Sequence, residues 1–148
     1  MRYQISLCLA VVSSSLSGCW PAMVRSSPHV EGTVTVGDAP ASGAQIYVQS
    51  IADDACDASS LHSVADENGA FAVPTGRRFE LYTPIQLGDR GFGWRMCIVY
   101  EGKYFAAFGQ GGWGEPPKKV RLACDLSTGE VPSASAPHRP GVCQALDE

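Results

Sequence analysis

The chain has 148 residues, enough for one folded domain and marginal for two, and its ordinary apolar content permits a single packed core. Its formal net charge is −4 and its basic residues form no long stripe, which argues against a nucleic-acid partner.

The first 18 residues have the pattern of a secretory signal. Arg2 supplies a positive charge, and the apolar run over 5–12 is too short to remain as a membrane-spanning helix. The sequence Leu16-Ser17-Gly18-Cys19 then resembles a bacterial lipobox, in which small residues fit an extended peptidase cleft and the cysteine accepts a lipid. An ordinary signal peptide followed by a coincidental cysteine is the alternative.

The resemblance to bacterial lipoproteins implies cleavage before Cys19, a diacylglycerol thioether on its sulfur and an acyl chain on its freed amine. Cleavage leaves 130 residues and, with the loss of Arg2, a formal net charge of −5. Because Trp20 after the cysteine is not acidic, the resemblance implies the outer membrane, with the folded domain facing the periplasm. The membrane, reached through the lipid anchor, is therefore the first expected partner.

The cysteine count fits an oxidising compartment. Cys8 leaves with the signal and Cys19 takes the lipid, so an even number of cysteines remains: Cys56, Cys97, Cys124 and Cys143. Their spacings contain no C-x-x-C, so disulfides are favoured over zinc or redox chemistry. Four cysteines allow three connectivities; we expect Cys97 with Cys124 inside strands, and Cys56 with Cys143 holding the tail.

After the signal, residues 19–28 are short, polar and bounded by proline, which is typical of a tether. Period-two alternation then predicts strands over 30–36 and 44–48, separated by turn residues at 37–40. Asn68-Gly69 predicts a hairpin between short strands, because both residues tolerate a positive φ. Expected strands further along cover 61–65, 70–73, 78–83, 94–100, 103–108 and 120–126, with loops at 87–93 and 109–117. The strands over 94–100 and 103–108 are expected to form a hairpin across Glu101-Gly102.

No long segment has helical periodicity, and residues 127–148 are rich in Ser, Pro and Ala, so we expect an irregular tail. About seven short strands separated by turn signals predict an all-β fold, a single antiparallel seven-stranded β-sandwich over 29–126.

Several motifs in order resemble the carboxypeptidase regulatory-like domain. They are Val30-Glu31-Gly32-Thr33-Val34, a turn with Gly37 and Pro40, Gly43-Ala44-Gln45-Ile46-Tyr47-Val48, and Ala65-Asp66-Glu67-Asn68-Gly69-Ala70-Phe71. The resemblance covers the first half of the folded region and implies a transthyretin-like sandwich. It implies no peptidase chemistry, since a fold does not supply a function.

No catalytic, cofactor or metal site is expected. His29, His62 and His138 are far apart in sequence and show no metal-ligand spacing. The sequence contains no G-x-S-x-G motif for a serine hydrolase. A hairpin turn accounts for residues 66–69 better than a calcium-binding loop does.

The unusual composition lies in the two glycine-rich segments. Phe92 and Trp113 stand among glycines that would leave aromatic faces uncovered, as sugar-stacking and peptide-docking surfaces require. The alternative to an exposed aromatic surface is that the neighbouring aromatics Trp94, Tyr104 and Phe108 occupy core positions, as the alternation predicts. We therefore expect a non-catalytic binding or structural module with Phe92 and Trp113 as the candidate surface. The rival functions are a component of an envelope secretion complex and a carbohydrate-binding module, so the expected partners beyond the membrane are an envelope protein or a glycan.

Overall fold

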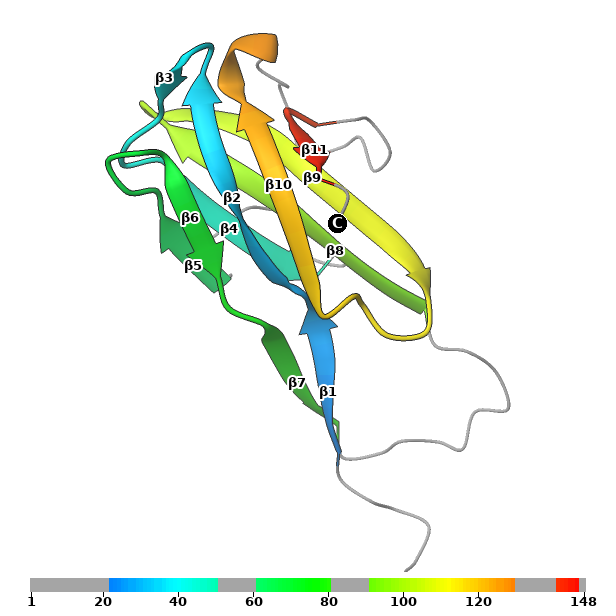
Figure 1. Ribbon diagram of the computed structural model, residues 1–148. Coiled ribbons are helices and arrows are strands. Elements are labelled where there is room, and N and C mark those ends of the chain that lie inside the picture. Colours follow the sequence, from blue (N-terminus) through cyan, green and yellow to red (C-terminus); the bar gives the residue numbers. More distant parts are fainter. Residues whose placement is uncertain (1–21, 51–60, 81–90, 130–140, 147–148) are drawn as a thin grey trace, which may run out of the picture.

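Residues 22–50, 61–80, 91–129 and 141–146 are described in the computed structural model, and they form an all-β structure (Figure 1). The signal residues, Cys19, Cys56, His138 and most of the expected tail lie outside these ranges. Two larger sheets share one hydrophobic core, and a separate two-stranded ribbon extends from one end of them.

One large sheet is organised around β2 (His29–Val36). On one side, β2 pairs in parallel with β10 (Lys119–Asp125), so the expectation of an entirely antiparallel sandwich is wrong at this pair. Alternation identifies a strand but carries no information about the direction of its neighbour. The remaining strands of this sheet are antiparallel: β3 (Ala39–Pro40), β6 (Ala70–Val73) and β11 (Cys143–Ala145).

The other large sheet is antiparallel throughout, in the order β5, β4, β8, β9. Its longest strands are joined across Glu101 and Gly102, which have φ values of 50° and 75° and form the expected tight hairpin turn. The strands are β5 (Leu61–Val64), β4 (Gln45–Ser50), β8 (Gly91–Tyr100) and β9 (Lys103–Trp113).

The core lies between the two sheets and follows the predicted alternation. Ile46 and Val48 of β4 are buried against residues such as Val30 and Leu122 of the facing sheet. Phe71, which follows the turn at residues 66–69, is buried as well. The apolar faces of the strands therefore supply the hydrophobic driving force that holds the sheets together.

The turn at residues 66–69 connects the two sheets rather than closing a hairpin ladder. β5 pairs with β4 and β6 pairs with β2, so the strands on either side of the turn enter different sheets. The Asp66 carboxylate accepts hydrogen bonds from the backbone N–H groups of Asn68 and Ala70, and Gly69 has a φ of 74°. The turn chemistry was predicted correctly, but the hairpin pairing was not.

A ribbon of two strands extends from the lower end of the sandwich (Figure 1). β1 (Ala22–Ser27) pairs antiparallel with β7 (Gly76–Glu80), so most of the segment expected as a tether is a paired strand. The base of the ribbon is buried in the body at Ser27 and Gly76. The Gly76 N–H donates to the Ser27 hydroxyl at 3.1 Å, which joins the two ribbon strands at this point.

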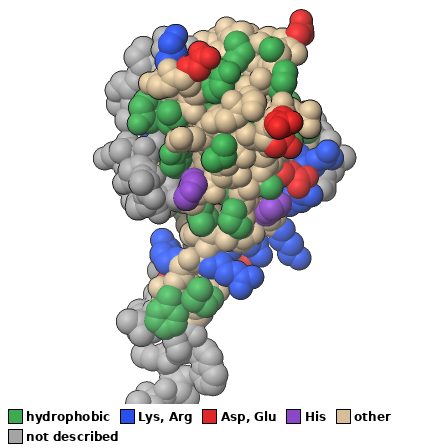
Figure 2. Space-filling model, turned by 90° about the vertical axis from the view of Figure 1, so that its left-hand side faces the viewer, with side chains coloured by type: hydrophobic (Ala, Val, Ile, Leu, Met, Phe, Trp, Pro, Cys, Tyr) green, Lys and Arg blue, Asp and Glu red, His purple; other side chains and the backbone are tan. Residues whose placement is uncertain are grey.

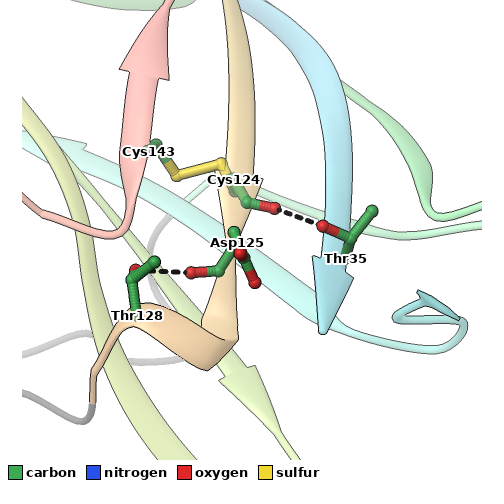
Figure 3. The surroundings of a disulfide bond; sticks show 5 residues. All are labelled: Thr35, Cys124, Asp125, Thr128 and Cys143. Carbon is green, nitrogen blue, oxygen red and sulfur yellow. Dashed lines mark hydrogen bonds between the residues drawn. A yellow bond between two sulfur atoms is a disulfide. The ribbon is translucent and has the colours of Figure 1, made fainter. Parts of the chain in front are cut away.

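A disulfide joins Cys124 of β10 to Cys143 of β11 (Figure 3), which contradicts the expected pairings of Cys97 with Cys124 and of Cys56 with Cys143. These two cysteines lie directly opposite each other on adjacent strands. Cys97 is also disulfide-bonded, and its partner lies outside the described residues. Cys97 and Cys124 belong to different sheets, a separation that the alternation pattern could not reveal.

β10 is followed by a short 3₁₀ turn, Leu126–Thr128, which closes this end of the sandwich. The Asp125 carboxylate accepts hydrogen bonds from the Ser127 N–H and hydroxyl and from the Gly37 N–H, the last at 2.9 Å. The Thr128 hydroxyl donates to the Asp125 carbonyl, and the Thr35 hydroxyl donates to the Cys124 carbonyl (Figure 3). Asp125 therefore ties the end of β10 to the turn after β2.

Candidate functional site

The two glycine-rich segments form one end of the β8–β9 pair. Gly91 lies opposite Trp113, Phe92 opposite Gly112, and Gly93 opposite Gly111. The described parts of the segments expected as loops are therefore strands as far as Trp113. Glycine is depleted in strands, so the composition favoured loops, whereas pairing with a long neighbour keeps these residues extended.

Phe92 and Trp113 lie on opposite faces of this β8–β9 end. Residues directly opposite each other in an antiparallel pair share a face, and successive residues alternate between faces. Phe92 therefore shares the inner face with Trp94 and Gly112, and it is partly buried against the core. Trp113 shares the outer face with Gly91, so the structure does not unite the two aromatic rings in one surface.

Trp113 is the most exposed of the large hydrophobic residues described, at 79%. Its cross-strand neighbour is Gly91, and the preceding residue on the same face of β9 is Gly111, both of them exposed. The two nearest positions on this face, Gly91 and Gly111, carry no side chain, so the indole lies beside exposed backbone. We call this surface, formed by Trp113 with Gly91, Gly109 and Gly111, the Trp113 face.

The Trp113 face also borders a sheet edge, because β9 is the last strand of its sheet. The Val142 N–H donates to the Ala106 carbonyl at 3.1 Å, so the first part of this edge is covered by the chain before β11. Within the described ranges, no strand pairs with the outer edge of β9 over residues 109–113. An uncovered edge of this kind can accept an extended peptide through backbone hydrogen bonds.

Arg95 lies farther along the same outer face, opposite Gly109. Its Nε and Nη2 atoms are buried and have no hydrogen-bond partner among the residues that the structure describes. Buried donors are normally satisfied, so this guanidinium is a candidate for contact with a carboxylate or another acceptor. Sequence reasoning missed Arg95, since a single arginine in an alternating segment reads as an exposed strand residue.

The loop after Trp113 contacts the ribbon. The Arg25 guanidinium in β1 lies 3.4 Å from the Glu115 carboxylate and donates to the Pro116 carbonyl at 2.9 Å. β9 also ends at the side of the body from which the ribbon extends (Figure 1). The Trp113 face is therefore at the ribbon end of the sandwich.

A charged cluster on the parallel β2–β10 pair has a structural explanation. The Glu31 carboxylate lies 2.8 Å from the Lys119 ammonium, 3.5 Å from the Arg121 guanidinium and 3.6 Å from the His29 imidazole. The hydrogen bond from Lys119, with the nearby positive charges, lowers the pKa of Glu31. Lys119 and Arg121 of β10 pair with Glu31 across the two strands, His29 pairs with it along β2, and no unpaired nucleophile or base is left in the cluster.

A shallow cavity lies at the opposite end of the sandwich, where the β8–β9 turn meets the 3₁₀ turn. Its volume is about 210 Å³, below the range of about 300–1,000 Å³ that is typical of small-molecule sites. Its lining includes Val36, Tyr100, Phe105 and Leu126. This hollow is too small to be preferred over the Trp113 face as a candidate site.

Metal ligation and membrane spanning have no candidates in the described ranges. No group of three or more His, Cys, Asp or Glu side chains is placed to hold a metal ion in the part of the chain that the structure describes. Among the same residues, no helix has the length and apolar character needed to cross a bilayer.

Comparison with known proteins gave no relatives: no protein-family model, curated protein or solved structure was found to match the chain.

Proposed function

We propose that this chain is a lipid-anchored periplasmic lipoprotein of the outer membrane that acts as a non-catalytic binding module. The lipobox-like sequence ending at Cys19 supports the anchor. We further propose that strands β2, β4, β5, β6, β8, β9 and β10 form a transthyretin-like sandwich, to which the β1–β7 ribbon, β3 and β11 are additions. The order of the carboxypeptidase regulatory-like motifs along β2, β4 and β6 supports this assignment.

The observation that carries the binding role is the exposure of Trp113 beside bare backbone. An aromatic ring that is 79% exposed contributes little to the core but offers a large contact area to a partner. The flanking glycines at 91 and 111 let a partner approach both the ring and the strand backbone.

An envelope protein is the partner that this geometry favours. The edge of β9 over residues 109–113 lies beside Trp113, so a strand added there would contact the indole as well as the backbone. Because the Trp113 face lies at the ribbon end, the partner would be held close to the membrane that carries the anchor. A component of an envelope secretion complex would satisfy this description.

The test is chemical crosslinking in intact cells followed by purification of the chain and identification of its partners. We expect Trp113→Ala to lower partner recovery or affinity about tenfold, since aromatic anchors typically contribute at least 1–2 kcal/mol. The matched control is Tyr104→Ala, which removes an aromatic ring that is 60% exposed near the opposite end of β9.

Stability measurements separate a lost contact from a damaged fold. The melting temperature of Trp113→Ala should match that of the parent, whereas Phe92→Ala should lower it, because Phe92 packs against the core and over Gly112. Unchanged partner recovery with Trp113→Ala, or equal losses with Tyr104→Ala, would contradict the binding role of the Trp113 face.

A carbohydrate-binding module is the second candidate, favoured by the same exposed indole, because sugar rings stack on uncovered aromatic faces. A glycan array probed with the parent and Trp113→Ala distinguishes the two. Glycan binding that depends on Trp113, without a crosslinked protein partner, would replace the protein-binding proposal.

A further inference from the structure

The β1–β7 ribbon has an ordered arrangement of apolar and basic side chains on one face. Met23 lies directly opposite Phe79, and Arg25 lies directly opposite Arg77. Positions two apart on a strand share a face, so these four side chains form two successive rungs on the same side. The Met23–Phe79 rung lies nearer the free end of the ribbon, and the Arg25–Arg77 rung lies nearer the body.

The apolar rung is exposed although both residues are large and hydrophobic. Met23 is 59% exposed and Phe79 is 56% exposed. Figure 2 shows hydrophobic side chains at the lower end of the described part of the molecule, with Lys and Arg side chains directly above them. Removing apolar surface from water is favourable, so an apolar environment would stabilise both side chains.

The two faces of the ribbon differ in charge. On the opposite face, the Arg78 guanidinium pairs with the Glu80 carboxylate at 2.7 Å. On the apolar face, Arg25 pairs with Glu115, while Arg77 has no ion-pair partner among the described residues. The face that carries Met23 and Phe79 therefore keeps an uncompensated positive charge.

The position of the ribbon in the chain identifies what covers this face. Ala22, the first residue of β1, is three residues after Cys19. Three residues span at most about 11 Å. If Cys19 carries the lipid, the free end of the ribbon must lie next to the phospholipid headgroups. Two rungs on one strand are roughly 7 Å apart. This is within the depth of about 5–10 Å to which apolar faces enter the headgroup/acyl boundary.

We propose that the β1–β7 ribbon docks on the membrane surface, with Met23 and Phe79 inserted at the acyl boundary and the unpaired Arg77 among the lipid phosphates. This inference rests on the proposed lipid anchor. The docked ribbon would hold the sandwich at a fixed height above the bilayer, since Ser27 and Gly76 at its base are buried in the body.

The test places the photocrosslinking residue p-benzoylphenylalanine at position 79 in the full-length protein. The matched control has the same residue in place of Tyr104, another exposed aromatic, near the turn that joins β8 to β9. The mature protein, purified from membranes, is reconstituted into vesicles of phosphatidylethanolamine and phosphatidylglycerol, irradiated and analysed by mass spectrometry. We expect phospholipid adducts at position 79 and at least tenfold fewer at position 104.

A second variant tests the basic rung. Adducts at position 79 should be enriched in the anionic lipid, and Arg77→Gln should lower that enrichment up to about fivefold, the effect of one basic residue near an anionic surface. Lys103→Gln, a charge removal near Tyr104, should leave it unchanged. Equal labelling of the two lipids by the parent protein would refute the role of the basic rung.

The same spectra report whether Cys19 is lipidated, so the lipid anchor and the docking of the ribbon can be refuted independently of each other. A lipidated protein with no more adducts at position 79 than at position 104 would overturn ribbon docking and leave the anchor standing. An unlipidated protein that still forms lipid adducts at position 79 would overturn the anchor and retain the docking. An unlipidated protein without adducts would overturn both.

Discussion

Gly32 shows how one missing side chain lets two strands approach. It lies opposite Leu122 in the parallel β2–β10 pair, and a Cβ atom at this position would collide with the Leu122 backbone carbonyl. The contact is with backbone, so it cannot be relieved by a change of rotamer.

We predict that Gly32→Ala lowers the free energy of unfolding by about 2–3 kcal/mol, as overpacking of a well-filled site does. Urea unfolding measures the change. Gly109→Ala is the matched control, since its added Cβ would meet no atom closer than 3.8 Å. Equal unfolding midpoints for Gly32→Ala and the parent would show that the strands can separate at this point.

Asp125 makes stability depend on pH through its hydrogen bonds. The Ser127 hydroxyl, followed by the backbone N–H groups of Gly37 and Ser127, lowers the pKa of Asp125 from its ordinary value of 3.8. A carboxylate with a lowered pKa in the folded state stabilises the fold above its unfolded pKa, and the contribution is lost as the pH falls through the folded pKa.

We therefore predict that Asp125→Ala reduces stability most at neutral pH, and that its difference from the parent shrinks below about pH 4. Thermal melts over a pH series give this difference. A difference that stays constant down to pH 2 would assign the Asp125 effect to packing alone.

At the scale of elements, the disulfide pairing is the clearest structural correction. Cys124 and Cys143 are 19 residues apart in sequence and join β11 to the edge of the β2–β10 pair. Closing a loop of this length stabilises a protein by about 3 kcal/mol in the chain-entropy description. If Cys8 is removed with the signal and Cys19 is lipidated, as we propose, Cys56 is the cysteine left to pair with Cys97.

We predict that peptide mapping of the unreduced protein recovers Cys124 linked to Cys143 and Cys56 linked to Cys97. The double variant Cys124→Ala/Cys143→Ala should lose about 2–4 kcal/mol of unfolding free energy. Recovery of a peptide linking Cys97 to Cys124 would contradict the pairing in the structure.

The elements also show what the sequence can reveal. Alternation located β2, β4, β8 and β10, and the turn residues at 101–102 located the β8–β9 turn, because both signals are local. β1 was missed because its strand character depends on pairing with β7, about 50 residues later. Glycine composition hid the ends of β8 and β9, and Phe92 and Trp113 could be assigned to opposite faces only once the register was known.

For the whole molecule, the structure has two ends with different chemistry. The ribbon, which begins at Ala22, and the Trp113 face lie at one end, and the shallow cavity beside the 3₁₀ turn lies at the other. A lipid at Cys19 would place the first end against the membrane. The anchor is therefore the claim on which both the location of the partner and the docking of the ribbon depend.

The most direct test is the membrane attachment of Cys19→Ala in cells, compared with the parent chain. A diacylglycerol and an N-acyl chain together exceed the single chain that binds membranes only reversibly. The account predicts that mass spectrometry finds both lipids on Cys19 of the parent. Cys19→Ala should lack them, fail to mature and lose its lipid-dependent membrane attachment. A Cys19→Ala protein that is cleaved at the same bond and remains firmly membrane-bound would contradict lipid anchoring at this residue.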